Sequence, residues 1–206
     1  MNIIEKDFID IQKNIHGMHI NKMREIIIFF RKVIAALVCI LFSICYYKIL
    51  KLKIPSISFS FSPFKLSKGS MTIIGSRAII SNHCELITEG RLKIGDNFCM
   101  NKYSRISAKG EIVIGHNVTI ARFVSILDHD HDYIMVENNI QYDGYSIEPI
   151  HIGNNVWIGD KVSITKGVVI GSNVIVGANS VVTNNIPNNV IVAGVPAKIL
   201  KHLSNE

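Results

Sequence analysis

An aliphatic residue returns at every sixth position in the C-terminal part of the chain. The six positions are Ile152, Ile158, Ile164, Ile170, Val176 and Val182. Four of them are followed by glycine. A unit this short buries its aliphatic side chain only against the units above and below it. Glycine and asparagine, as in residues 153–155 and 171–173, tolerate the left-handed backbone of tight corners. The spacing predicts a β-solenoid with three flat faces per coil rather than an antiparallel sandwich.

The same period appears earlier in the chain, in a less regular form. It is carried by Ile74, Ile80, Leu86, Ile114, Ile120 and Ile126. The register is then lost over residues 127–150, a stretch with four aspartates, two glutamates and two histidines. Long loops between rigid elements are commonly functional. We therefore expect residues 127–150 to form a catalytic loop.

Two motifs resemble a known family, the hexapeptide-repeat acyltransferases. They are the stretch from Ile152 to Gly159 and the stretch from Val192 to Lys198. The resemblance covers residues 70–203 and is closest to bacterial saccharide O-acetyltransferases that modify lipopolysaccharide and capsule. It implies a left-handed parallel β-helix, and this handedness comes from the resemblance alone.

The N-terminal region differs from the repeats in charge and hydropathy. Residues 1–69 hold 11 Lys and Arg against 4 Asp and Glu, and residues 33–47 contain no charge. That run is short for a membrane span, which needs about 20 apolar residues. We interpret residues 1–53 as a basic region with an apolar helix that lies in an anionic leaflet. The alternative is a helix that caps the solenoid or packs between subunits. Residues 54–69, with alternation from Pro55 to Phe64, are expected to form an extended lead-in.

The four cysteines show neither metal-ligand nor disulfide spacing. They are Cys39, Cys45, Cys84 and Cys99. They are interpreted as small buried side chains in a reducing compartment. Together with the basic apolar region, this places the protein in the cytoplasm, at the inner face of the cell membrane.

The expected chemistry lies in the sequence from Asp128 to Asp132, which alternates aspartate and histidine. Transfer of an acetyl group to a hydroxyl needs a base, and a neutral imidazole serves near physiological pH. In the family, the catalytic histidine lies ten residues after the alanine of an Ile-Ala pair, and ten residues after Ala121 is His131. His131 is therefore the expected base, with His129 as the second candidate and Asp128 as the acid that orients the imidazole.

A zinc site is the competing interpretation of these histidines. The gamma-class carbonic anhydrases share the trimeric β-helix and bind zinc through histidines. The candidate ligands in this chain are His116, His129, His131 and His151. Their spacing differs from that class, so we expect no metal.

The resemblance also implies binding residues. Asn101 matches the asparagine that orients the acceptor sugar, and Trp157 matches a tryptophan beside the acyl donor. A left-handed corner residue and a residue that packs on the next coil are the respective structural alternatives. The groove for acetyl-CoA is implied to lie between subunits and to include Gly159, Gly177, Ala178, Thr183 and Lys198. Lysine at 198 stands where the family often has arginine, so it offers a phosphate a point charge rather than a bidentate contact.

These features predict a homotrimeric, acetyl-CoA-dependent O-acetyltransferase for a saccharide, with direct transfer and no nucleic-acid partner. One alternative is an acetyltransferase for a small soluble acceptor such as an antibiotic, serine or a nucleotide-linked amino sugar. Another is a trimeric scaffold or a metal-dependent hydratase. The basic N-terminal region favours the membrane-associated glycan acceptor, because a soluble acceptor gives no reason for an anchor.

Overall fold

The computed structural model describes residues 64–204, the strands Leu50–Leu52 and Ser58–Phe59, and five helical residues near the N-terminus. Those five, which are exposed, are Ile26, Phe30, Val33, Ile34 and Leu37. The rest of the expected apolar helix and basic region lies outside the described residues. Among the described residues, no helix has the length and apolar character needed to cross a membrane.

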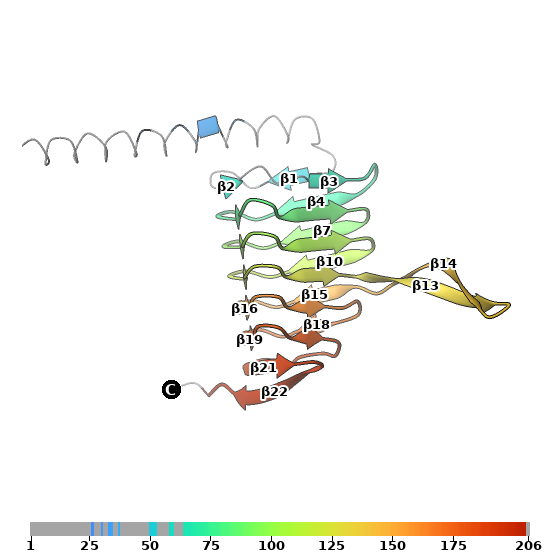
Figure 1. The fold of residues 1–206 in the computed structure, drawn as a ribbon. Helices are drawn as coiled ribbons and strands as arrows, with labels where there is room; N and C mark the ends of the chain where they lie inside the picture. The colour runs from blue at the N-terminus through green and yellow to red at the C-terminus, as the bar shows by residue number, and fades with distance from the viewer. Residues whose placement is uncertain are drawn as a thin grey trace, which may run out of the picture.

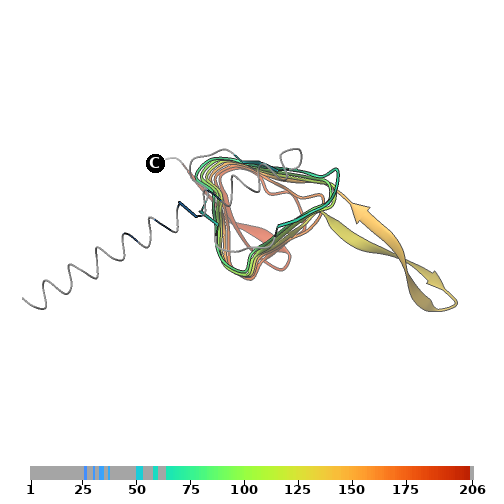
Figure 2. The same cartoon turned by 90° about the horizontal axis from the view of Figure 1, so that it is seen from above.

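Three parallel sheets form the three faces of a β-solenoid, which has a triangular outline along its axis (Figures 1 and 2). Sheet A contains β1 (Leu50–Leu52), β4 (Met71–Ile74), β7 (Arg91–Ile94), β10 (Glu111–Ile114), β15 (Ile150–Ile152) and β18 (Val169–Ile170). Sheet C contains β3 (Phe64–Leu66), β6 (Glu85–Thr88), β9 (Arg105–Ala108), β12 (Ser125–Leu127), β17 (Ser163–Ile164) and β20 (Val181–Val182). The predicted β-solenoid is thereby confirmed.

Sheet B closes the triangle and ends in the one antiparallel pair among the described strands of the three solenoid sheets. It contains β2 (Ser58–Phe59), β5 (Ile79–Ile80), β8 (Cys99–Met100), β11 (Thr119–Ile120), β16 (Val156–Ile158), β19 (Val174–Val176), β21 (Val190–Gly194) and β22 (Ala197–His202). Because β1, β2 and β3 pair in parallel with β4, β5 and β6, the solenoid begins before residue 70. Within the expected lead-in at 54–69, the described strands β2 and β3 therefore pair with the coil that follows.

The core is one column of aliphatic side chains along the solenoid axis. Strand residues alternate between inside and outside, as in β10, where Ile112 and Ile114 are buried and their neighbours are partly exposed. Each fully buried side chain of this size contributes about 1.5–3 kcal/mol relative to exposure. Stacking is what buries the column, so each coil depends on its neighbours.

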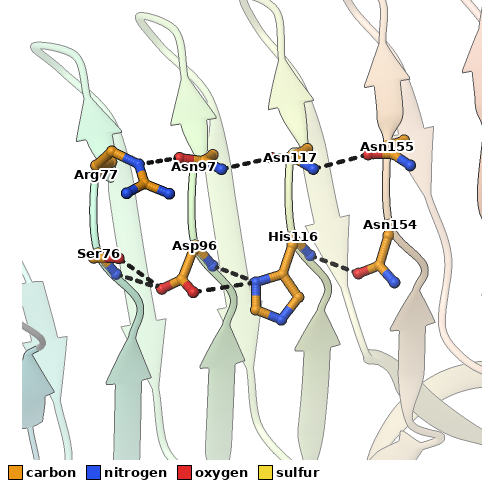
Figure 3. A network of polar contacts seen from close by, with 8 residues as sticks. All are labelled: Ser76, Arg77, Asp96, Asn97, His116, Asn117, Asn154 and Asn155. Carbon is orange, nitrogen blue, oxygen red and sulfur yellow. Dashed lines mark hydrogen bonds and ion pairs between the residues drawn. The ribbon is translucent and has the colours of Figure 1, made fainter.

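The corner between sheets A and B is held by a ladder of asparagine amides (Figure 3). Asn97 Nδ2 donates to Asn117 Oδ1 at 2.6 Å, Asn117 Nδ2 to Asn155 Oδ1 at 2.9 Å, and Asn155 Nδ2 to Asn173 Oδ1 at 3.0 Å. These asparagines take the left-handed backbone, with φ between 56° and 58°.

The corner glycines have a different role from the one expected. A Cβ on Gly153 would lie 2.7 Å from the carbonyl carbon of Gly171, and Gly153 is absent from the left-handed residues. Glycine is needed at this corner because successive backbones approach closely, while asparagine supplies the left-handed turn.

The corner between sheets B and C carries an aromatic stack. His83 and Tyr103, and Tyr103 and Phe123, stack with ring centroids 5.1 Å apart. All three residues are left-handed, and Lys161 takes the same position in the next coil. The corner between sheets C and A is the one the chain leaves to form the excursion at 127–150 (Figure 2).

Candidate active site

The excursion is an antiparallel ribbon rather than the loop that we expected. Strands β13 (His129–Val136) and β14 (Asn139–Ile147) pair along their length, and the ribbon projects away from the solenoid (Figure 1). Alternation of side chains in this stretch satisfies the period-two pattern of a strand. We call residues 129–147 the arm.

Asp128 fixes the root of the arm to the preceding coil. Its side chain is fully buried, and its two oxygens accept the backbone N–H groups of Lys109 and Gly110, each at 2.8 Å. Its carbonyl oxygen accepts the N–H of Glu148, at 2.9 Å, where the chain returns. Asp128 therefore ties together the exit and the return of the arm.

His129 contacts the same buried carboxylate. Its Nδ1 lies 2.9 Å from Asp128 Oδ1, and 12% of its side chain is exposed. A carboxylate only accepts, so the hydrogen bond assigns the proton to Nδ1 and leaves Nε2 with its lone pair. This is the arrangement of an imidazole base held in one tautomer.

His131 lies one step further out and packs against tyrosines. It pairs with Tyr145 across the ribbon, with ring centroids 4.7 Å apart, and its centroid is 5.2 Å from that of Tyr142. Tyr145 also makes an edge contact with His129, at 5.5 Å. The two histidines are thus joined through one tyrosine ring.

Two lysines surround this cluster. Lys109 Nζ lies 4.0 Å from the centroid of Tyr145 and pairs with Glu89. Lys166 Nζ lies 3.3 Å from Glu148 and 3.5 Å from Asp130. The hydrogen bond to Glu148 is the main cause that raises the pKa of Lys166. Both ammonium groups are thus paired with carboxylates.

The pKa of Tyr142 is also raised, first by desolvation and then by its hydrogen bond to Tyr145. A phenol with the ordinary pKa of about 10 is already neutral at physiological pH, so the raised pKa leaves Tyr142 a hydrogen-bond donor.

The expected acceptor and donor residues lie mainly at the B–C corner. Asn101 follows β8 and donates from Nδ2 to the carbonyl of Ile120 at 3.0 Å. The left-handed residue of this corner is Tyr103, with φ 64°, so the alternative interpretation of Asn101 as the left-handed residue is wrong. Trp157 stands on the outer face of β16 between Thr119 and Ile175, with 57% of the residue exposed.

Three of the five expected donor residues meet in adjacent coils. A Cβ on Gly159 would lie 2.7 Å from Ala178 N, and one on Gly177 would lie 2.8 Å from Ala193 Cβ. Close approach of the neighbouring backbone thus accounts for Gly159, and close approach of the Ala193 methyl group accounts for Gly177. Thr183 follows β20, at the side of sheet C that lies away from the B–C corner.

Lys198 lies on the terminal strand β22, opposite Ala193. Within one chain, Gly159, Gly177 and Ala178 therefore lie at a different corner from the histidines, whereas Thr183 follows β20 at the C–A corner, where the arm also leaves the solenoid.

The four histidines of the zinc interpretation are also separated. His116 lies at the A–B corner beside Asp96 at 3.4 Å, His151 is on sheet A, and the other two are at the root of the arm (Figure 3). Among the residues described by the structure, no group of three or more His, Cys, Asp or Glu side chains is arranged to hold a metal ion.

Sequence reasoning missed Lys109 and Tyr145. Lys109 precedes Asp128 by 19 positions, about one coil, so the coil length was the signal that would have brought it to the site. Tyr145 follows from the ribbon register, which requires the arm to be recognised as two strands.

Comparison with known proteins gives matches to acyltransferases. Residues 149–184 match the bacterial transferase hexapeptide (six repeats) family. The galactoside O-acetyltransferase of Escherichia coli is 37% identical over 142 residues, which are 68% of either chain. The putative lipopolysaccharide biosynthesis O-acetyl transferase WbbJ of Escherichia coli is 40% identical over 124 residues, and the alignment spans 57% of this chain and 63% of WbbJ.

A solved structure shares the fold. A mutant of AntD, an N-acyltransferase from Bacillus cereus in complex with dTDP and coenzyme A, superposes with a TM-score of 0.65. The match covers 80% of this chain and 88% of AntD at 23% sequence identity. At this identity the likeness shows a common architecture.

Proposed function

Because this chain belongs to the hexapeptide-repeat acyltransferase family, we propose that it is an acetyl-CoA-dependent O-acetyltransferase that modifies a saccharide of a surface glycan. The names of two relatives, a galactoside O-acetyltransferase and a putative lipopolysaccharide O-acetyl transferase, support a sugar hydroxyl as the acceptor. The observation that carries the proposal is the buried Asp128–His129 pair at the root of the arm.

His129 is the base in this mechanism. Its Nε2 takes the proton of the sugar hydroxyl, and the hydroxyl oxygen attacks the thioester carbonyl of acetyl-CoA. Asp128 stabilises the resulting imidazolium, and backbone N–H groups near the donor stabilise the oxyanion. The C–S bond then breaks, and the imidazolium returns its proton to the thiolate of coenzyme A. Transfer is direct, with no acyl-enzyme.

The family spacing favours His131 for this role instead. We assign the role to His129 because, of the two rings, it is the one that contacts the buried carboxylate. His131 packs against Tyr145 and lines the same site.

We further propose that the site is completed between subunits of a homotrimer. Strands of sheet C separate the arm root from the corner of Asn101, Gly159 and Ala178, so one chain does not place the base beside the donor residues. A neighbouring copy supplies the second corner, and a heterologous contact of this kind closes into a ring. Sedimentation that shows a fully active monomer would contradict the trimer.

Membrane association at the cytoplasmic face remains part of the proposal. It rests on the excess of Lys and Arg in residues 1–53 beside the uncharged run at 33–47. Each cation near an anionic surface adds about 1 kcal/mol. Flotation with vesicles of phosphatidylglycerol and phosphatidylethanolamine tests it, since the intact chain should float and a chain without residues 1–49 should stay in solution.

The activity itself is tested with acetyl-CoA and a panel of acceptors. The panel holds neutral mono- and oligosaccharides of galactose, glucose and N-acetylglucosamine, a nucleotide sugar, and lipid-linked oligosaccharide. Mass spectrometry should detect the gain of one acetyl group on a saccharide, and the His129→Ala variant should serve as the control. Acetyl-CoA that binds without transfer to any of these acceptors would refute the proposed function.

A further inference from the structure

The arm has two faces of different chemistry. Paired residues lie on the same face, and His129, His131, Tyr133 and Met135 pair with Ile147, Tyr145, Tyr142 and Ile140. These eight residues, which we call the tyrosine face, include no Asp, Glu, Lys or Arg. The arm carries four acids and no Lys or Arg. Two of these acids, Asp130 and Asp132, alternate with the histidines and therefore point to the opposite face.

A bulge in β14 puts Tyr142 and Tyr145 on one face. In a regular strand, residues three apart point to opposite sides. Here the register shifts between His131 and Tyr133, so three steps along β14 match two along β13, and Gly144 has φ 98°. A bulge of this type restores the phase. The two tyrosine centroids consequently lie 5.7 Å apart, beside His131.

The tyrosine face is exposed beyond the histidines. Tyr133 is 67% exposed, Tyr142 60% and Ile140 72%. An isolated two-stranded ribbon is marginally stable in water, and a wholly uncharged face on such a ribbon indicates contact with a partner. The face is continuous from His129 to the tip, so a molecule bound on it reaches the proposed catalytic base.

We propose that the tyrosine face binds the glycan chain of the acceptor beyond the acetylated residue, and that this chain carries no net negative charge. This inference rests on the proposed function. Tyrosine offers a flat apolar ring against the C–H face of a sugar and a hydroxyl that bonds sugar hydroxyls. Successive rows of the face are about 6.7 Å apart, twice the rise of a strand residue, so the outer rows lie beyond a single sugar bound at His129.

The charge of the arm selects among glycans. The arm holds four carboxylates, and Lys166 pairs with Asp130 at its root. The other three, Asp132, Glu137 and Asp143, lie further out and repel a polyanionic chain or a nucleotide diphosphate laid along the arm. An uncharged oligosaccharide experiences no such repulsion. The inference thus favours a neutral oligosaccharide acceptor over a nucleotide sugar.

The test compares acceptors of different length in wild-type and variant proteins. The probes are galactose and galactotetraose, glucose and maltotetraose, N-acetylglucosamine and its tetrasaccharide, and oligogalacturonate as the anionic chain. We expect kcat/KM for a neutral tetrasaccharide to exceed that for its monosaccharide. Tyr133→Ala should lower this ratio by about three- to tenfold, the loss of one aromatic contact.

The matched control is Ile134→Ala, which removes a similarly placed apolar side chain, 44% exposed, from the opposite face. It should leave the ratio unchanged. Deletion of Gly144 should lower the ratio like Tyr133→Ala, because a one-residue shift moves Tyr142 to the opposite face.

Each outcome separates this inference from the proposed function. Equal rates for monosaccharides and tetrasaccharides would overturn the inference while the acetyltransferase stands. Preference for oligogalacturonate would overturn the charge argument. A change of oligomeric state in Tyr133→Ala, measured by sedimentation, would show that the face contacts a second copy and would also overturn it. If no acetyl group is transferred to any probe or to lipid-linked oligosaccharide, both this inference and the proposed function are wrong.

Discussion

Replacing Asp128 by asparagine tests whether its carboxylate fixes the arm. Asparagine has one acceptor oxygen, whereas Asp128 accepts from Lys109 N, Gly110 N and His129 Nδ1 through two oxygens. In its best orientation the amide oxygen keeps Lys109 and His129, and the NH₂ group then faces the Gly110 N–H. One buried donor therefore loses its acceptor.

The cost follows from that single lost contact. A hydrogen bond to a charged group contributes about 1.5–3 kcal/mol, and an unpaired buried donor costs a similar amount. We expect Asp128→Asn to lower the free energy of unfolding by about 2–4 kcal/mol, or the Tm by about 5–15 °C for a chain of this length. The kcat should also fall at least tenfold, because the charge that stabilises the imidazolium is gone.

Thermal unfolding and steady-state acetyl transfer measure the two effects. The control is Asp132→Asn, at an exposed position of the arm, where a change below about 0.5 kcal/mol is expected. If Asp128→Asn keeps the wild-type Tm and kcat, the carboxylate neither fixes the arm nor supports the base.

Four further variants test the mechanism and the coil packing. His129→Ala should lower kcat by about a hundredfold or more and His131→Ala by less, and the reverse order in steady-state kinetics would return the role of base to His131. The hydrogen bond from the Arg122 N–H, and next that from the Arg122 side chain, lower the pKa of Asp160 in the folded protein. The stabilisation from this pair is therefore present above the ordinary carboxyl pKa of about 3.9, and it is lost as the pH falls through the lower pKa of the folded state. Asp160→Asn should therefore flatten the decline of Tm between pH 5 and pH 3, and an unchanged decline would contradict this assignment. Ile158→Ala, in the fully buried column, should cost about 2–5 kcal/mol in denaturant unfolding, and a loss below 1 kcal/mol would show that the coils collapse around the cavity.

The sequence predicts the solenoid well where a coil is three hexads long. Asn155 and Asn173 are one coil of 18 residues apart, so the sixfold spacing continues from coil to coil. Asn97 and Asn117 are 20 apart, because the earlier coils have longer strands in sheets C and A. The spacing then resets once per coil, which is why the early repeats look irregular although the fold is the same.

The arm and the site were harder to predict. The alternation of His129, His131, Tyr133 and Met135 has the period of a strand, but the loss of the sixfold spacing over 127–150 indicated a loop. The Asp128–His129 contact also depends on Lys109 and Gly110, which only coil stacking brings near. Spacing in the family pointed to the segment 128–132, while our preference for His129 over His131 rests on the buried hydrogen bonds.

The asparagine ladder has a consequence for how the coils find their order. All the donors point in the same direction along the axis, from the guanidinium of Arg77 through the amides of Asn97, Asn117, Asn155 and Asn173 to the acceptor Asn189. The rungs between asparagines are chemically alike, so a coil that stacked one such rung out of place would still form these bonds. The ladder stabilises the stacking of coils but does not specify their order. The arm occurs once, and the Asp128 carboxylate binds one corner of one neighbouring coil. This contact therefore fixes which coil lies next to the arm, which the repeats alone do not specify. A duplicated coil inserted away from the arm should then be accommodated, whereas one inserted between Gly110 and Asp128 should separate the Asp128 carboxylate from the N–H groups of Lys109 and Gly110.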